Sequence, residues 1–202
     1  MTDRRAHWDA TYTARAEDQV SWFQKMPARS LAMIAKASPG GSMIDVGGGA
    51  SRLVDVLLDA GRDDVTVLDI SRVALDRTKA RLGDKAARAN WICADITQWT
   101  PDRTWDVWHD RAVFHFLTDT ADQDTYIKTL MAATHPGSAV ILSAFALTGP
   151  ERCSFLPVQR YSPAGLKARL GAAFVLEDEA LEAHVTPWGA TQDFAYAAFR
   201  RR

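Results

Sequence analysis

The feature of this chain that most constrains its fold is a run of three glycines, residues 47–49, directly after a short apolar segment. Residues 43–46 are typical of a buried strand, and the glycines predict a tight turn from that strand into a helix. Glycine permits the positive φ values of such a turn and leaves no Cβ between the main chain and a ligand. Asp45 precedes the first glycine by two residues, and Arg52 stands where a dinucleotide-binding turn has its third glycine. The spacing Asp-x-Gly-x-Gly therefore favours a ligand that carries an amino acid over one that carries a pyrophosphate.

Two further strands are predicted after this turn, and each ends in an acid. Residues 65–68 are β-branched and apolar and lead to Asp69, while residues 91–94 lead to Asp95 and the apolar Ile96. An acid at the end of the second strand is placed to accept hydrogen bonds from ribose hydroxyls. The pair Asp95 and Ile96 could bind an adenine amino group and pack on its ring. The three strand ends together indicate a nucleoside site.

The rest of the chain continues an alternation of helices and strands. Expected helices cover residues 3–16, 27–37, 51–58, 72–82, 121–134 and 164–170, and later expected strands cover 105–111, 139–145, 174–183 and 191–199. A turn is expected over residues 38–41, residues 135–137 are expected to break the chain before the strand at 139, and the last two strands form an antiparallel hairpin. This order predicts an α/β fold with a doubly wound sheet and a ligand at the carboxyl ends of its strands, near the switch point.

Length and composition fit one domain over residues 1–202, with 1–37 as an N-terminal helical lid segment and 38–202 as the core. The chain has 47% apolar residues and a formal net charge of −1, which offers no broad basic field for nucleic acid. Residues 200–202 are expected to form a solvated basic tail. No signal peptide and no apolar run of roughly 20 residues is present, which predicts a soluble cytoplasmic protein without membrane partners. Cys93 and Cys153 suggest neither a disulfide framework nor a metal site.

Four motifs in this order resemble those of the class I, Rossmann-like S-adenosylmethionine-dependent methyltransferases. Residues 45–49 are similar to the family's first motif, Asp69 to its ribose-binding acid, Asp95 with its neighbour to the adenine-contacting pair, and residues 105–111 to the fourth-strand motif. The resemblance implies the strand order 3-2-1-4-5-7-6 with the last strand antiparallel. It also implies S-adenosylmethionine as cofactor and S-adenosylhomocysteine as product. The implied cofactor site consists of Asp45, Gly47, Gly48, Gly49, Asp69, Ile70, Asp95, Ile96, Asp110 and Trp22.

The segment after the fourth strand supplies the candidate catalytic residues Asp110, Arg111 and His115. It resembles the Asp-Arg-Gly or Asp-Lys-Gly segment of thiopurine-type and some lysine methyltransferases, with Ala112 in place of the glycine. A histidine titrates near neutrality, so His115 could take a proton from a thiol, hydroxyl or amine. The alternatives are a structural, hydrogen-bonded His115 and an Asp110 that caps a helix N-terminus. His109 is expected to point the other way along the strand.

Two segments are expected to cover the acceptor. The aromatic residues Trp8, Tyr12, Trp22 and Phe23 could form a lid, or they could pack two helices onto the sheet. The second segment is the loop at residues 147–161, ordered by two prolines. In it, Arg152 or Arg160 could clamp an anion, Tyr161 could donate a hydrogen bond, and Cys153 could react if an arginine lowered its pKa. The expected acceptor-binding residues are Trp8, Tyr12, Cys153, Arg160 and Tyr161, although surface arginines could also merely solvate the loop.

The sequence thus predicts a methyltransferase that uses S-adenosylmethionine and acts on a small molecule, with a thiol or other soft nucleophile as the first choice. The chain has no added substrate domain and no basic field, and short segments close its pocket. Two alternatives stay open: a protein lysine N-methyltransferase and a protein that binds the cofactor without catalysis. A monomer or a homodimer is expected, and no metal.

Overall fold

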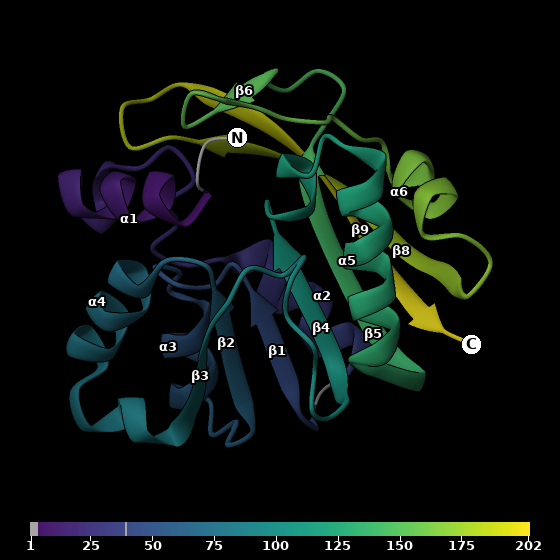
Figure 1. Cartoon of the computed structure of the whole chain (residues 1–202), viewed down its shortest axis with the longest axis horizontal. Helices are drawn as coiled ribbons and strands as arrows, with labels where there is room; N and C mark the ends of the chain where they lie inside the picture. The colour runs from purple at the N-terminus through teal and green to yellow at the C-terminus, as the bar shows by residue number, and fades with distance from the viewer. Residues whose placement is uncertain (1–3, 39) are drawn as a thin grey trace.

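A seven-stranded sheet forms the centre of the computed structural model, which describes residues 4–38 and 40–202 (Figure 1). The strand order is β3-β2-β1-β4-β5-β9-β8, and a separate two-stranded hairpin is formed by β6 and β7. Strands β1 to β5 are parallel, whereas β9 runs antiparallel to both β5 and β8. Counted along the sheet alone, this is the predicted order 3-2-1-4-5-7-6 with an antiparallel last strand, which the structure confirms.

The elements alternate as the sequence pattern predicts, with bounds that shift by a few residues. The strands are β1 Met43–Val46, β2 Val65–Asp69, β3 Ala89–Cys93, β4 Trp105–Arg111, β5 Thr134–Phe145, β6 Arg152–Cys153, β7 Leu156–Pro157, β8 Phe174–Val185 and β9 Thr191–Arg201. The helices are α1 Arg4–Ala14, η1 Glu17–Gln19, α2 Ala28–Ala37, α3 Leu53–Asp59, α4 Arg72–Leu82, η2 Gly83–Arg88, η3 Phe114–Phe116, α5 Thr120–Ala132 and α6 Pro163–Leu170. Asp3 and Pro39, which fall in the expected first helix and first turn, lie outside the described residues.

Helices cover both faces of the sheet, which makes a three-layer fold. On one face, α5 and α6 pack on inward-facing side chains of the strands, including Trp105, Trp108 and Phe199. On the other face, apolar side chains of α2, α3 and α4 pack on the alternate residues of β1, β2 and β5. Strands buried on both faces explain the nearly continuous apolar runs in the sequence.

Two expectations for the second half of the chain are wrong. Residues 135–137 do not interrupt the chain before a strand, because they lie within β5, beside a register irregularity between Trp105 and Val107 of β4. Nor do Arg200 and Arg201 form a solvated tail. Both belong to β9, where Arg200 pairs with Glu177 and Arg201 donates to the carbonyl oxygen of Met131. Tertiary hydrogen bonds therefore fix Arg200 and Arg201, which the sequence suggested were part of a solvated tail.

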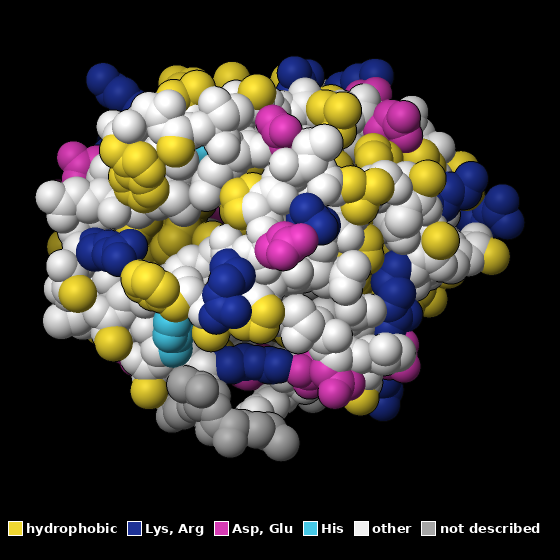
Figure 2. Space-filling view, turned by 90° about the horizontal axis from the view of Figure 1, so that it is seen from above, with side chains coloured by type: hydrophobic (Ala, Val, Ile, Leu, Met, Phe, Trp, Pro, Cys, Tyr) yellow, Lys and Arg dark blue, Asp and Glu magenta, His cyan; other side chains and the backbone are white. Residues whose placement is uncertain are grey.

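The topology sets the place of the site. The parallel strands β1 to β4 all end at one edge, and α1 together with β6 lies above that edge (Figure 1). Seen from above, arginines and lysines are scattered among acidic and apolar side chains on this face (Figure 2). No described helix is long and apolar enough to cross a membrane.

Candidate active site

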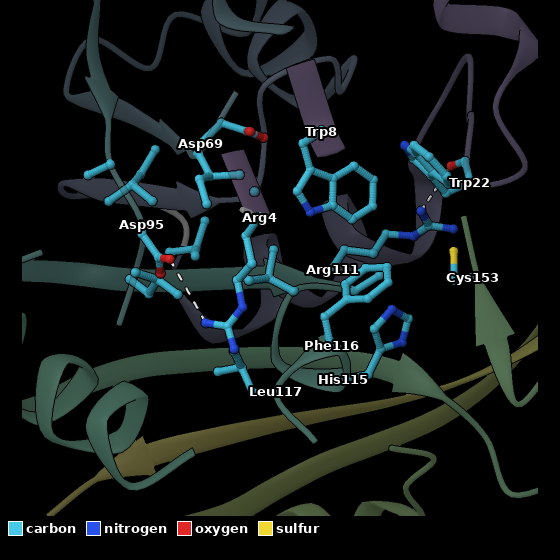
Figure 3. A pocket seen from close by; sticks show the side chains of 18 of the residues that line it. Arg4, Trp8, Trp22, Asp69, Asp95, Arg111, His115, Phe116, Leu117 and Cys153 are labelled. Carbon is cyan, nitrogen blue, oxygen red and sulfur yellow. Dashed lines mark hydrogen bonds and ion pairs between the residues drawn. The ribbon is translucent and has the colours of Figure 1, made fainter. Parts of the chain in front are cut away.

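A crevice opens at the carboxyl ends of β1, β2 and β4, under the cover of α1 (Figure 3). It consists of two adjoining cavities that share Tyr12, Trp22, Val46, Gly47 and Arg111. The larger cavity is also lined by Arg4, Trp8, Leu68, Asp69, Ile70, Ala94, Asp95, Ile96, Ala112, Val113, His115, Phe116, Leu117, Phe145, Cys153 and Phe194. The smaller one contains Asp45, Gly48 and His109. The crevice lies at the edge where the sequence predicts the ligand, because parallel strands bring their carboxyl ends to one edge.

Asp45 borders the smaller cavity and has one acceptor atom without a partner among the described residues. Its Oδ1 is 2.7 Å from Nδ1 of His109, and His109 Nε2 is 2.9 Å from the Ser30 hydroxyl. Its Oδ2 is buried and has no hydrogen-bond partner in the described part of the chain. A buried carboxylate oxygen without a partner is costly, so this atom fits a ligand that brings a donor, such as an ammonium group.

The glycine turn lets the chain pass close to these acids. Gly47 has φ +74°, and a Cβ there would lie 2.0 Å from Val113 Cγ2. A Cβ on Gly48 would lie 2.2 Å from the free Oδ2 of Asp45 and would close the space beside it. Gly49 lines neither cavity, and its N–H donates to Asp69 at 2.9 Å. Two of the three glycines therefore border the crevice, while the third positions an acid.

The far end of the larger cavity carries Asp69, Ile70, Asp95 and Ile96, as the sequence predicts. Burial raises the pKa of Asp69 to about 6, although N–H groups of Ser71 and Gly49 donate to it and oppose the shift. Each carboxylate oxygen of Asp69 accepts one backbone hydrogen bond and keeps capacity for a hydroxyl donor. The arrangement suits a ribose diol beside Asp69 and an apolar ring beside Ile96.

Helix α1 covers this end and is tied down by polar contacts. Arg4 forms an ion pair with Asp122, and its guanidinium also lies 3.9 Å from Asp95 (Figure 3). Asp9 accepts a hydrogen bond from the Ser71 hydroxyl at 2.6 Å, at the start of α4. Trp8 lies on the crevice side, with its ring centroid 5.7 Å from that of Trp22 and 5.0 Å from that of Phe116. The leading segment thus both covers the cavity and packs on the domain, so the two predicted roles are compatible.

Arg111 lies at the opposite end from Asp95 and borders both cavities (Figure 3). It donates to the Tyr196 hydroxyl and to the Trp22 carbonyl oxygen, each at 3.0 Å, and its guanidinium carbon lies 4.5 Å from the centroid of the Phe194 ring. Its Nη2 is buried without a partner among the described residues. These neighbours are all neutral, and no described carboxylate lies within ion-pair distance of the guanidinium, so the cation keeps a free donor.

His115 does not fit the predicted role of general base. The side chain is fully buried, and Nδ1 accepts a hydrogen bond from the Phe145 backbone N–H at 3.3 Å. A neutral imidazole with an accepting Nδ1 carries its proton on Nε2, so the nitrogen left over is a donor. Burial and the nearby charge of Arg111 lower the pKa of His115 to about 3. A neutral His115 therefore offers an N–H at Nε2, and this geometry favours a donor role over the expected general base.

Asp110, an expected catalytic and cofactor-binding residue, makes structural contacts in this fold. It lines neither cavity, and its carboxylate accepts from the Val113 and Phe114 backbone N–H groups at 2.8 and 3.0 Å and from the Tyr126 hydroxyl at 2.6 Å. Its pKa rises to about 6 because of burial. These contacts resemble the capping alternative considered from the sequence, because Asp110 holds the turn that carries His115.

The loop at residues 147–161 contributes less to the crevice than the sequence suggested. Arg160 donates to the carbonyl oxygen of Leu147 at 2.9 Å and pairs with Glu151, so it ties the loop together and lines neither cavity. Tyr161 is buried in the core against Phe114, with ring centroids 5.5 Å apart. Cys153 does border the larger cavity, but burial raises the pKa of its thiol to about 12. It is therefore an unreactive wall of the cavity.

Several site residues escaped sequence reasoning. His109 points to the opposite face of the sheet from Asp110, as expected, but its contact with Asp45 was not foreseen; the two residues are register partners on β4 and β1. Phe145 and Phe194 come from β5 and β9, and no local signal marks them as cavity walls. Knowledge of strand pairing would have found His109, because paired residues in adjacent strands share a face of the sheet. Among the described residues, no cluster of three metal-ligating side chains exists.

Ala112 has φ +74°, a left-handed conformation that costs an L-residue about 1 kcal/mol relative to glycine. This is the position where the related Asp-Arg-Gly segment has glycine, so the chain keeps the conformation without the residue that favours it. We expect Ala112→Gly to raise the free energy of unfolding by about 1 kcal/mol in urea denaturation. The matched control is Ala80→Gly on the exposed side of α4, which should lower it by about as much. Equal losses in both variants would contradict the assignment of strain to Ala112.

Comparison with known proteins finds similarity to methyltransferases. A protein-family model described as a methyltransferase domain matches residues 43–137. Nodulation protein S of Rhizobium tropici is 24% identical over 121 residues, which are 60% of this chain and 50% of that protein. The chain spans half or less of the length of the curated relatives it matches.

Solved structures resemble the chain over nearly its whole length. One, described by the conversion of a disulfide bond into a thioacetal group during echinomycin biosynthesis, has a TM-score of 0.74 at 21% identity and covers 98% of this chain and 92% of that chain. Another is the 1,6-didemethyltoxoflavin-N1-methyltransferase of Burkholderia thailandensis with bound 1,6-didemethyltoxoflavin and S-adenosylhomocysteine. It has a TM-score of 0.69 at 18% identity and covers 98% and 83% of the two chains. At these identities the likeness establishes the shared fold.

Proposed function

We propose, from the premise that residues 43–137 belong to the methyltransferase domain family and form a class I S-adenosylmethionine-dependent domain, that this chain methylates a small-molecule acceptor. The observation that carries the proposal is the joined crevice under α1. It has an acid set suited to the cofactor at one end and an aromatic chamber with Arg111 and His115 at the other.

The residues present fit the cofactor. The free Oδ2 of Asp45, beside a glycine that leaves room for a ligand, would accept from the ammonium of the amino-acid end. Asp69 would hold the ribose, and Asp95 with Ile96 would border the adenine. When bound, S-adenosylmethionine supplies a methyl group on a positively charged sulfur. Trp8, Trp22 and Phe116 would exclude water and present ring faces to that charge.

A small acceptor fits the enclosure better than a protein side chain. α1 and Cys153 of the β6 hairpin both border the larger cavity, so the acceptor must fit beneath covering segments (Figure 1). The names of the structural neighbours support the class, since one is a 1,6-didemethyltoxoflavin-N1-methyltransferase and another refers to the conversion of a disulfide bond into a thioacetal group. We therefore keep a thiol or another soft nucleophile as the preferred acceptor. Asp110, Arg160 and Tyr161 drop out of the proposed site.

Substitution of Asp45 tests cofactor recognition. We expect Asp45→Asn to weaken binding of S-adenosylhomocysteine about 30-fold, because a hydrogen bond to a charged group contributes roughly 2 kcal/mol. Asparagine can still accept from His109, so the fold should hold. Isothermal titration calorimetry measures the effect, and 5′-methylthioadenosine, which lacks the amino-acid end, is the matched ligand. Its affinity should not change in Asp45→Asn. An equal loss for both ligands would mean that Asp45 does not recognise the ammonium.

The acceptor class is tested by transfer assays with labelled S-adenosylmethionine. Thiols, phenols, carboxylates and amines of low molecular weight form one panel, and a cell protein extract forms the other. Turnover with a small molecule and none with protein supports the proposal. Labelling of lysine side chains alone would favour the protein methyltransferase reading. Tight cofactor binding without transfer to either panel would favour a binding protein without catalysis.

A further inference from the structure

We infer that the acceptor of this enzyme is a small, largely apolar anion whose charged group is held by Nη2 of Arg111 and the Nε2–H of His115. The inference rests on the proposed function and narrows its substrate class. It begins from two buried donors that have no partner among the described residues and that belong to residues lining the larger cavity.

The first donor belongs to a cation without a counter-ion. No described carboxylate lies within ion-pair distance of Arg111, whose contacts are the Tyr196 hydroxyl, the Trp22 carbonyl oxygen and the Phe194 ring. Glu182 interacts with Tyr196, which contacts Arg111, and accepts a hydrogen bond from the Gln24 side chain at 2.8 Å. A partly buried guanidinium with an unused N–H is stabilised when an anion joins it, because the anion supplies both charge and acceptor.

The second donor is fixed in its role by the backbone. The Phe145 N–H occupies Nδ1 of His115, so Nε2 holds the imidazole proton. The ring lies beside Arg111 and Phe116, away from Asp69 and Asp95 (Figure 3). A ligand group placed between Arg111 and His115 meets two unpartnered donors and no acid paired with Arg111, which favours an anion or a strong hydrogen-bond acceptor over an ammonium group.

The walls of this chamber define the body of the acceptor. Trp8, Trp22, Phe116, Phe145 and Phe194 line it, together with the un-ionised thiol of Cys153. These apolar faces match a flat or aromatic body and raise the cost of leaving the two donors unpaired. An acceptor that arrives as an anion needs no general base, which agrees with the lack of a proton acceptor at His115.

The test uses three isosteric probes on the protein saturated with S-adenosylhomocysteine: benzoate, benzamide and benzamidine, which are anionic, neutral and cationic. We expect benzoate to bind at least about tenfold tighter than benzamide and benzamidine not to bind, as measured by calorimetry. Thiophenolate then separates the two sources of charge. If thiophenolate competes with benzoate, the charge that the two donors hold is that of the nucleophilic sulfur. If thiophenolate and benzoate bind together, the acceptor's charge is on a group separate from the sulfur. Equal affinity for benzoate and benzamide would overturn the inference.

Variants assign the effect to the two donors. Arg111→Gln and His115→Phe should each weaken benzoate binding about tenfold and leave S-adenosylhomocysteine binding unchanged. Arg111→Lys, which keeps the charge, and His115→Gln, which can keep a donor, guard against misfolding and should recover part of the affinity. If Arg111→Gln instead weakens S-adenosylhomocysteine but not 5′-methylthioadenosine, Arg111 holds the cofactor carboxylate and the inference is wrong. Because the cofactor product is titrated first, failure of the proposed function shows separately as a failure to bind it.

Discussion

Asp110→Ala is expected to lower the free energy of unfolding by about 4 kcal/mol. The carboxylate is fully buried and accepts from two backbone N–H groups and from the Tyr126 hydroxyl. Alanine leaves these donors unpaired in the interior, and each unpaired donor costs about 1–3 kcal/mol. Since a domain of this kind has about 5–15 kcal/mol in total, the variant should be marginally stable. Urea denaturation followed by circular dichroism measures the loss.

Asp119→Ala is the matched control for this effect. Asp119 also accepts from a backbone N–H, that of Ala121 at 2.7 Å, but it is exposed at the start of α5. Its removal should cost only about 1 kcal/mol, because water can replace the lost partner. Similar losses in the two variants would contradict the view that burial makes Asp110 important. A soluble Asp110→Ala protein that loses turnover at full stability would return Asp110 to the catalytic residues.

His115 is expected to make stability depend on pH between pH 7.5 and pH 4. Its folded pKa of about 3 lies below its ordinary value of 6.5, so the unfolded chain binds the proton more readily. The stability that comes from keeping His115 neutral is fully present about one pH unit above 6.5 and is lost as the pH falls toward the folded pKa. Relative to His115→Gln, which does not titrate, the wild type should lose about 2 kcal/mol by pH 5 and about 3 kcal/mol by pH 4.

The difference between the two proteins isolates this histidine. Asp69 and Asp110 have raised pKa values, which make stability fall as the pH rises from about 4 to 6, but they are present in both proteins and cancel. The measurement is a set of urea titrations from pH 4 to pH 8. Parallel curves for wild type and His115→Gln would show that His115 titrates normally in the folded protein. It would then be accessible as a base, and the donor role proposed for it would fail.

The sequence by itself determined the order of elements, the glycine turn, the acids at the strand ends and the methyltransferase resemblance. These features are local: alternation of apolar runs, glycine where the backbone needs it, and a polar residue where a strand stops. The parallel arrangement then brings Asp45, Asp69 and Asp95 to one edge without any further information. This is why most of the residues expected at the cofactor end line the crevice.

The tertiary structure alone decided the acceptor end. Whether His115 accepts or donates a proton depends on the Phe145 N–H, which comes from β5, thirty residues away in the chain. Whether Asp110 is free depends on Tyr126 of α5, and whether Arg111 has a counter-ion depends on what β9 and the leading segment place beside it. Sequence pattern shows which groups can ionise. Their protonation state and their unpaired hydrogen-bond donors and acceptors are set by burial and by partners that only folding brings into contact.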